Sequence, residues 1–165
     1  MGSFFLDGSA LAKRYVPEAG TALVDSLLDH VAEHRIFLLN VGYAEVVSVL
    51  VRKKNAGRIS SGDFSRALSA FGQEIVRSPG KHLVLFDNSV VNTATALIVK
   101  HSINATDGIA LRVRLDVATV LRGHGDSLVL VASDQRLLRA AQAEGVTTFD
   151  PEAQDQAALA ALIGP

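Results

Sequence analysis

The sequence predicts an α/β fold with a mostly parallel sheet, on three observations. Short apolar runs alternate with longer stretches of helical periodicity, and parallel strands need such helical crossovers. The chain has 165 residues, of which 48% are hydrophobic, which suits one substantial core and is too little for two ordinary domains. It shows no repeat, linker or low-complexity tract. We therefore expect a single domain over residues 1–165.

Four or five strands are expected, each a short apolar run bounded by polar or turn residues. In chain order the runs are Phe4–Leu6, Ile36–Leu39, Leu83–Phe86, Leu128–Ala132 and, as the fifth, Val146–Phe149. After the first strand, the apolar residues between Leu23 and Val31 recur at helical spacing and predict an amphipathic helix.

Capping residues predict where the remaining helices begin and end. The expected helices run from Asn40 to about Lys54, from Ser60 or Ser61 to Val76, from Asp87 or Asn88 to about His101, from Thr106 to Leu121, from Ser133 or Asp134 to about Gly145, and from beyond Pro151 towards the end of the sequence.

Charge and composition exclude several classes of protein. A formal net charge of -1 and a pI near 6.5 argue against a protein that binds nucleic acid by bulk electrostatics, so any such contact must be local. The absence of cysteine excludes disulfides and thiolate metal sites and fits a reducing cytosol. No signal peptide begins the sequence and no apolar run approaches the roughly 20 residues of a membrane span. We expect a cytoplasmic protein with no membrane partner.

Acidic residues directly follow three of the expected strands. Asp7, Asp87 and Asp134 stand there, where an open α/β sheet places its ligand site. Asp is also a favoured helix N-cap, so each residue has capping as a simpler explanation. Local spacing does not separate the three.

Two further carboxylates lie in the helical segments. Glu45 stands between Gly42 and Ser48 on one narrow stripe of a helix that is otherwise apolar almost all round. The stripe is either solvated or the site of a carboxylate that needs a cation. Asp107 lies in the first turn of its helix, where the helix dipole already favours negative charge.

Four carboxylates at one sheet edge would repel one another unless divalent cations neutralised them. All-oxygen ligands suit Mg²⁺ or Mn²⁺, and such cations bridge phosphate oxygens and activate water in many nucleases. The residues by themselves therefore indicate an acidic metal site.

Four stretches resemble the PIN-domain nucleases, and more narrowly the VapC-type toxins of toxin–antitoxin pairs. They are FFLDGSALAKRYVPEAG, YAEVVSVLVRK, NATDGIALRVRLDVA and LVLVASDQRLLRAAQAEGVTTFDPE, and the resemblance that they carry covers nearly the whole chain. The resemblance implies a three-layer α/β/α sandwich in which Asp7, Glu45, Asp107 and Asp134 form the catalytic and metal-binding quartet.

The resemblance also assigns the neighbouring residues. Asp87 is left as a helix cap, because the family places its third strand at a sheet edge. Ser9 and Ser133 match positions that often hold a small hydroxyl residue near the acids, with helix capping as the alternative. Gly108 stands where the family usually has Ala, and Ala110–Leu111 replaces a segment that is often polar.

As a function, the resemblance implies Mg²⁺- or Mn²⁺-dependent hydrolysis of RNA by a metal-activated water. It also implies a homodimer and a small VapB-like antitoxin as partners. For substrate contact, Lys13 and Arg14 lie within two helical turns of Asp7, and Arg136 lies close to Asp134. A solvated face is the alternative for all three.

Two rival functions remain open. Residues His30, Glu33 and His34 match the H-x-x-E-H pattern of a group of zinc hydrolases, although they fall at the end of a helix. The chain can also be a catalytically weak PIN-like module that only binds RNA or protein.

Overall fold

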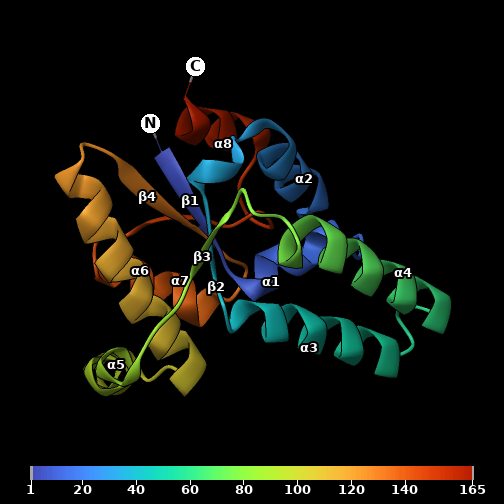
Figure 1. Ribbon diagram of the computed structural model, residues 1–165, viewed down its shortest axis with the longest axis horizontal. Helices are drawn as coiled ribbons and strands as arrows, with labels where there is room; N and C mark the ends of the chain where they lie inside the picture. The colour runs from blue at the N-terminus through green and yellow to red at the C-terminus, as the bar shows by residue number, and fades with distance from the viewer. Residues whose placement is uncertain (1, 165) are drawn as a thin grey trace.

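A five-stranded, all-parallel sheet forms the centre of the computed structural model, which describes residues 2–164 (Figure 1). Its order is β3-β2-β1-β4-β5, and each neighbouring pair is parallel. The strands are β1 (Gly2–Leu6), β2 (Ile36–Leu39), β3 (His82–Val84), β4 (Ser127–Val131) and β5 (Thr147–Phe149). The predicted mostly parallel α/β fold is confirmed.

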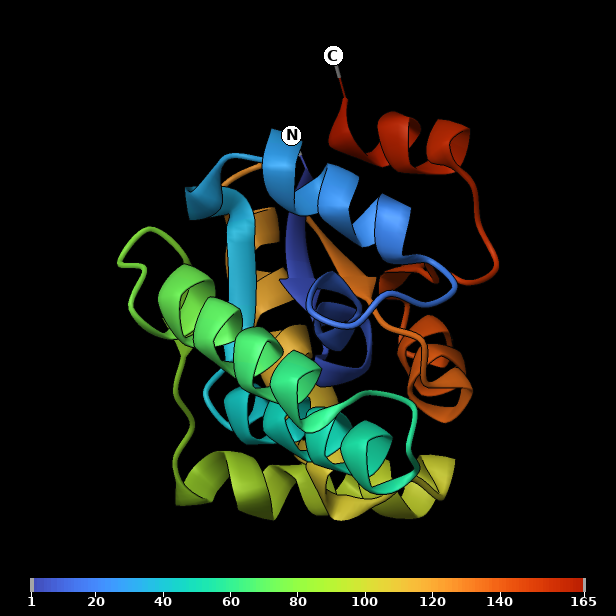
Figure 2. The same cartoon turned by 90° about the vertical axis from the view of Figure 1, so that its right-hand side faces the viewer.

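Helices cover both faces of the sheet (Figures 1 and 2). They are α1 (Gly8–Leu11), α2 (Thr21–His30), α3 (Gly42–Asn55), α4 (Ser61–Phe71), α5 (Asn88–His101), α6 (Ala105–Gly123), α7 (Gln135–Ala143) and α8 (Gln156–Ile163). A π-helical turn at Gly72–Val76 continues α4 to the predicted end at Val76. In the described part of the chain, no helix is both long and apolar enough to cross a membrane.

The strand side chains divide the core into two layers. On β1, Phe4 and Leu6 pack with α1, α2, α3 and α4, whereas Phe5 points to the opposite face and packs against α6. All five β1 residues are buried, as expected for a central strand covered on both sides. This alternation produces the three-layer sandwich.

Some predicted helix starts are wrong by one or two residues. The side chain of Asn104, and not that of Thr106, accepts the capping hydrogen bond of α6. Helix α3 starts at Gly42, and Asn40 bonds only the Val41 N–H ahead of it. The third strand ends at Val84, so that Leu85 lies outside it and is 70% exposed. At α6 the neighbouring Asn104 offered the same capping chemistry as Thr106, whereas no side chain caps the start of α3.

The strand order places a crevice at the centre of the sheet. The chain builds outward from β1 through β2 to β3 and then crosses to the other side of β1 for β4 and β5. The order therefore reverses between β1 and β4. Ligands of open α/β sheets bind beyond the carboxyl ends of the strands at such a point.

Candidate acidic active site

A cavity of about 590 Å³ lies at the carboxyl ends of β1 and β4, and all four predicted carboxylates line it. We call it the acidic cavity. Asp7 comes from the end of β1, Glu45 from the first turn of α3, Asp107 from the first turn of α6 and Asp134 from the end of the β4 loop. The fold thus brings together four residues that lie up to 127 positions apart.

Asp7 is the most enclosed of the four, with only 8% of its surface exposed. Its Oδ1 accepts a hydrogen bond from Nη2 of Arg114 at 2.8 Å. Its Oδ2 accepts hydrogen bonds from the Ser9 hydroxyl at 2.7 Å and the Ser9 N–H at 3.0 Å, which caps α1. Asp7 therefore both caps α1 and lines the acidic cavity.

Ser9 joins the two strand ends that flank the cavity. Its hydroxyl donates to Asp7 and accepts a hydrogen bond from the Ser133 N–H at 3.0 Å. Asp134, the N-cap of α7, follows Ser133 directly. The Ser133 hydroxyl is buried and has no partner among residues 2–164. Through these two hydrogen bonds, Ser9 fixes the position of Asp7 relative to the loop that carries Asp134.

Glu45 lies against Gly8, and the absence of a side chain on Gly8 makes room for the Glu45 side chain. A Cβ at position 8 would stand 2.7 Å from the Glu45 Cβ, so only glycine allows this approach. Burial raises the pKa of Glu45 to about 7, and repulsion by Asp7 and Asp107 adds to the shift. The Arg114 charge and a backbone hydrogen bond from Gly8 oppose it.

The pKa of Asp107 is raised for similar reasons. Burial brings its pKa to about 6, with further contributions from the charges of Asp134 and Asp7. One of its carboxylate oxygens accepts a 2.8 Å hydrogen bond from the Asn104 side chain. The charges of Asp7 and Asp134 thus act on Asp107 in the same direction as its burial.

Arg114 is a member of this site that the sequence analysis missed. It is 1% exposed, pairs with Asp7, and places its guanidinium 4.8 Å from the centre of the Phe5 ring. Its Nε and Nη1 are buried and have no partner in the described chain. The available signal was spacing, because residues seven apart lie on one helix face and Arg114 follows Asp107 by seven.

The donor set fits Mg²⁺ or Mn²⁺ in type, because it consists of carboxylate oxygens. The raised pKa values of Glu45 and Asp107 also favour a cation, because the cavity holds more negative charge than its surroundings stabilise. However, no group of three or more His, Asp or Glu side chains within residues 2–164 is arranged to hold one ion. A cation would therefore have to draw the carboxylates inward.

The predicted substrate cations differ in their partners. Lys13 is 1% exposed, and its ammonium pairs with Glu18 at 3.2 Å and with Glu152. Arg14 pairs with a separate group of carboxylates, those of Asp25, Asp29 and Glu74. Arg136, by contrast, is exposed, has no ion pair in the described chain, and its charge lowers the pKa of Asp107.

Asp87 and the histidine motif lie outside the acidic cavity. Asp87 caps α5 through the N–H groups of Ser89 and Val90, next to the edge strand β3. For the zinc interpretation, α2 ends at His30, so His30 and His34 do not share one helix. Glu33 instead pairs with Lys81 at 2.6 Å. The zinc site predicted as an alternative is therefore contradicted.

The fold is shared with three solved structures. The chain matches PAE2754 from Pyrobaculum aerophilum with a TM-score of 0.59 and 20% identity, over 98% of each chain. It matches FitAB bound to the IR36 DNA fragment with a TM-score of 0.59 and 18% identity, over 93% of this chain and 98% of the other. It matches FitAcB from Neisseria gonorrhoeae with a TM-score of 0.55 and 18% identity, over 92% and 99%.

Neither known family models nor curated proteins match the sequence. The structural matches establish the architecture, which is the three-layer α/β/α sandwich that the sequence resemblance implied.

Proposed function

We propose that the chain is a divalent-metal-dependent endoribonuclease and the toxin of a VapBC-type pair. One observation carries the proposal: Asp7, Glu45, Asp107 and Asp134, from four separate segments, line one cavity at the point where the strand order reverses. Helix capping explains Asp7 and Asp134 individually. It does not explain why the four carboxylates share a cavity in which two of them have raised pKa values.

The four carboxylates would hold Mg²⁺ or Mn²⁺, which supplies a Lewis acid for the phosphate and an activated water. The chain's own residues prepare the site. Arg114 and Ser9 fix the two oxygens of Asp7, and Ser9 also orders the loop that carries Asp134. Glu45, with a pKa of about 7, can take up or release a proton near neutral pH.

A partner protein follows from the same proposal. The resemblance of the sequence to VapC-type toxins, together with the fold that the chain shares with FitAB and FitAcB, supports a VapB-like antitoxin for the present chain. We also propose a homodimer, for which the apolar side chains exposed at Leu85, Val99 and Val120 offer surface. RNA as substrate and the absence of cysteine both fit a cytoplasmic site of action.

A second candidate is a PIN-like module with weak or no catalysis. The Arg114–Asp7 ion pair favours it, because a fixed positive charge already neutralises one of the carboxylates. A metal titration distinguishes the two candidates, since such a module shows no Mn²⁺ binding that depends on the four acids.

The proposed function is tested by Asp7→Asn, with Asp87→Asn as the matched control. Both residues follow a strand and cap a helix, and Asn preserves capping. We expect Asp7→Asn to lower metal-dependent cleavage of a labelled RNA by more than about 100-fold, because a ligand matters at least as much as the groups that orient it. The control should cleave like the wild type. Undiminished cleavage by Asp7→Asn would contradict the proposal.

A further inference from the structure

The arginines around the acidic cavity fall into two groups. Many cations near it are held in ion pairs, including Lys13, Arg14 and Arg114. Four exposed arginines have no ion pair or side-chain hydrogen bond within the described chain: Arg52, Arg58, Arg136 and Arg139. An arginine without an internal partner remains available to an external anion.

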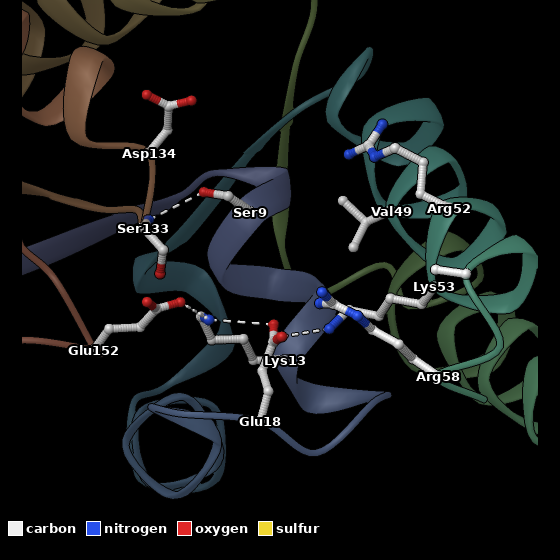
Figure 3. A pocket seen from close by; sticks show the side chains of 11 residues that line it. Ser9, Lys13, Glu18, Val49, Arg52, Lys53, Arg58, Ser133, Asp134 and Glu152 are labelled. Atoms are coloured by element: carbon white, nitrogen blue, oxygen red, sulfur yellow. Dashed lines mark hydrogen bonds and ion pairs between the residues drawn. The ribbon is translucent and has the colours of Figure 1, made fainter.

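Two of these arginines border a second cavity, which Figure 3 shows from close by. This side cavity, of about 490 Å³, is lined by Arg52 and Arg58. Ser9, Val49, Arg52 and Asp134 line both cavities, so the two are contiguous. In Figure 3, Arg52 and Arg58 lie on the side opposite Ser133 and Asp134.

The lysines of the side cavity are already neutralised. Lys13 pairs with Glu18 and Glu152, and Lys53 also pairs with Glu18, as the dashed lines in Figure 3 indicate. Two lysines and two glutamates balance one another. The guanidinium groups of Arg52 and Arg58 therefore supply the positive charge that an anion would meet there.

The other two arginines lie on α7, beyond Asp134. Arg136 and Arg139 line a third cavity, of about 300 Å³, together with His101 and Ser102. Arg136 follows Asp134, which lines the acidic cavity, by two positions, and its backbone N–H donates to the Asp134 carboxylate. Unpaired arginines are thus present on both flanks of the carboxylates, on the α3 side and on the α7 side.

We propose that Arg52 and Arg58 on one flank, and Arg136 and Arg139 on the other, bind the phosphates on either side of the cleaved bond of a single RNA strand. This inference rests on the proposed function, which supplies RNA as the substrate. A groove of unpaired arginines suits a sugar–phosphate backbone, since guanidinium groups bind phosphate oxygens in pairs. The carboxylates are partly buried in their cavity, so the strand must enter it without a paired complement.

The test measures RNA binding without cleavage. The full chain is titrated against a fluorescein-labelled oligouridylate in EDTA, by fluorescence polarisation over a range of salt concentrations. We expect Arg52→Ala/Arg58→Ala and Arg136→Ala/Arg139→Ala each to weaken binding about 10-fold or more at low salt. Each pair should also reduce the slope of log K against log salt by about 1.4, because each lost phosphate contact of a single strand contributes about 0.7.

The matched control is Arg66→Ala/Arg112→Ala, which removes the same charge from arginines held in helix ion pairs outside all three cavities. It should leave the slope unchanged. An unchanged slope in either flanking pair, or equal competition by duplex RNA, would overturn the inference. Cleavage by the wild type in Mn²⁺ is measured separately, so a protein that binds along this path without cleaving refutes only the proposed function.

Discussion

Glu45 and Asp107 differ from the other shifted carboxylates of the chain in the direction of their pKa shifts. Both pKa values are raised, whereas those of Asp63, Asp87 and Glu144 are lowered by hydrogen bonds or ion pairs. The sequence left open whether the lone carboxylate at Glu45 is solvated or needs a cation. The structure places Glu45 near the carboxylates of Asp7 and Asp107, and their negative charge strengthens the case for a bound cation.

The raised pKa values predict how stability depends on pH when no metal is present. Since the folded-state pKa of each group lies above its unfolded value, the native state binds more protons between about pH 4 and 7. The stability is fully present below the unfolded values and is lost as the pH rises through about 6 and 7. We expect the free energy of unfolding in EDTA to fall by about 1 to 2 kcal/mol from pH 5 to pH 8, discounted for partial exposure.

Urea unfolding across this range checks the prediction. Glu45→Gln should flatten the part of the curve near pH 7, and Asp107→Asn the part near pH 6. Asp116→Asn, an exposed carboxylate on α6, serves as the control and should keep the full pH dependence. A free energy of unfolding of the wild type that rises between pH 5 and pH 8 would contradict the raised pKa values of Glu45 and Asp107.

Arg114 offers a second prediction at this scale. Arg114→Met should lower the free energy of unfolding by about 3 kcal/mol, because it leaves the buried Asp7 carboxylate without its cation. Arg112→Met removes an exposed pair with Asp116 from the same helix and should change stability by about 0.5 kcal/mol or less. Equal urea midpoints for Arg114→Met and wild type would show that the two unpartnered nitrogens of Arg114, Nε and Nη1, offset its ion pair.

At the scale of the elements, short-range chemistry explains most of what could be predicted. Ser60 caps α4 with a reciprocal bond to Asp63, and Asp87 caps α5; in each case this is the first of the two neighbouring caps that the sequence offered. The predicted start of α6 at Thr106 was wrong, because Asn104 and Thr106 are both good caps, two residues apart. Which of them bonds the backbone depends on where Ile103 enters the core, and no local pattern reveals that.

The packing of α5 on α6 gives a prediction about Gly108. A Cβ there would lie 2.3 Å from Cγ1 of Ile98, so the glycine permits the close approach of the two helices. Gly108→Ala should destabilise the protein by about 1 kcal/mol, since overpacking exceeds the gain of about 1 kcal/mol in helix propensity. Gly123→Ala, at the open end of the same helix, has no such neighbour and should be neutral or stabilising. Thermal melting of both variants checks the expected difference in sign.

At the scale of the whole molecule, the periodic pattern predicted the strands, whereas the site depends on their spatial order. Asp7, Asp87 and Asp134 look alike in sequence, and only the order β3-β2-β1-β4-β5 places two of them at the centre and the third near an edge. The family resemblance supplied only the edge position of the third strand. The pairing of Lys13 with Glu152 and of Arg114 with Asp7 joins residues more than 100 positions apart, so the partners of the cations could not be predicted.

The last prediction links the acidic cavity to the folding of the whole chain. A divalent cation that binds only the folded state stabilises it by about 2.7 kcal/mol at 100 times its Kd. Because Glu45 and Asp107 have pKa values of about 7 and 6, Mn²⁺ at pH 6 must displace protons from them. We therefore expect the apparent Mn²⁺ affinity to increase between about pH 5 and pH 7.5 and then to level off.

Calorimetric titration in two buffers of different ionisation enthalpy measures the protons released. Glu45→Gln should release fewer protons than the wild type, and Asp87→Asn, whose carboxylate caps α5 elsewhere, should release the same number. Mn²⁺ binding without proton release at pH 6 would place the ion away from the raised carboxylates. Binding that survives the loss of both Asp7 and Glu45 would have the same meaning, because the fold would then hold the cation with other residues.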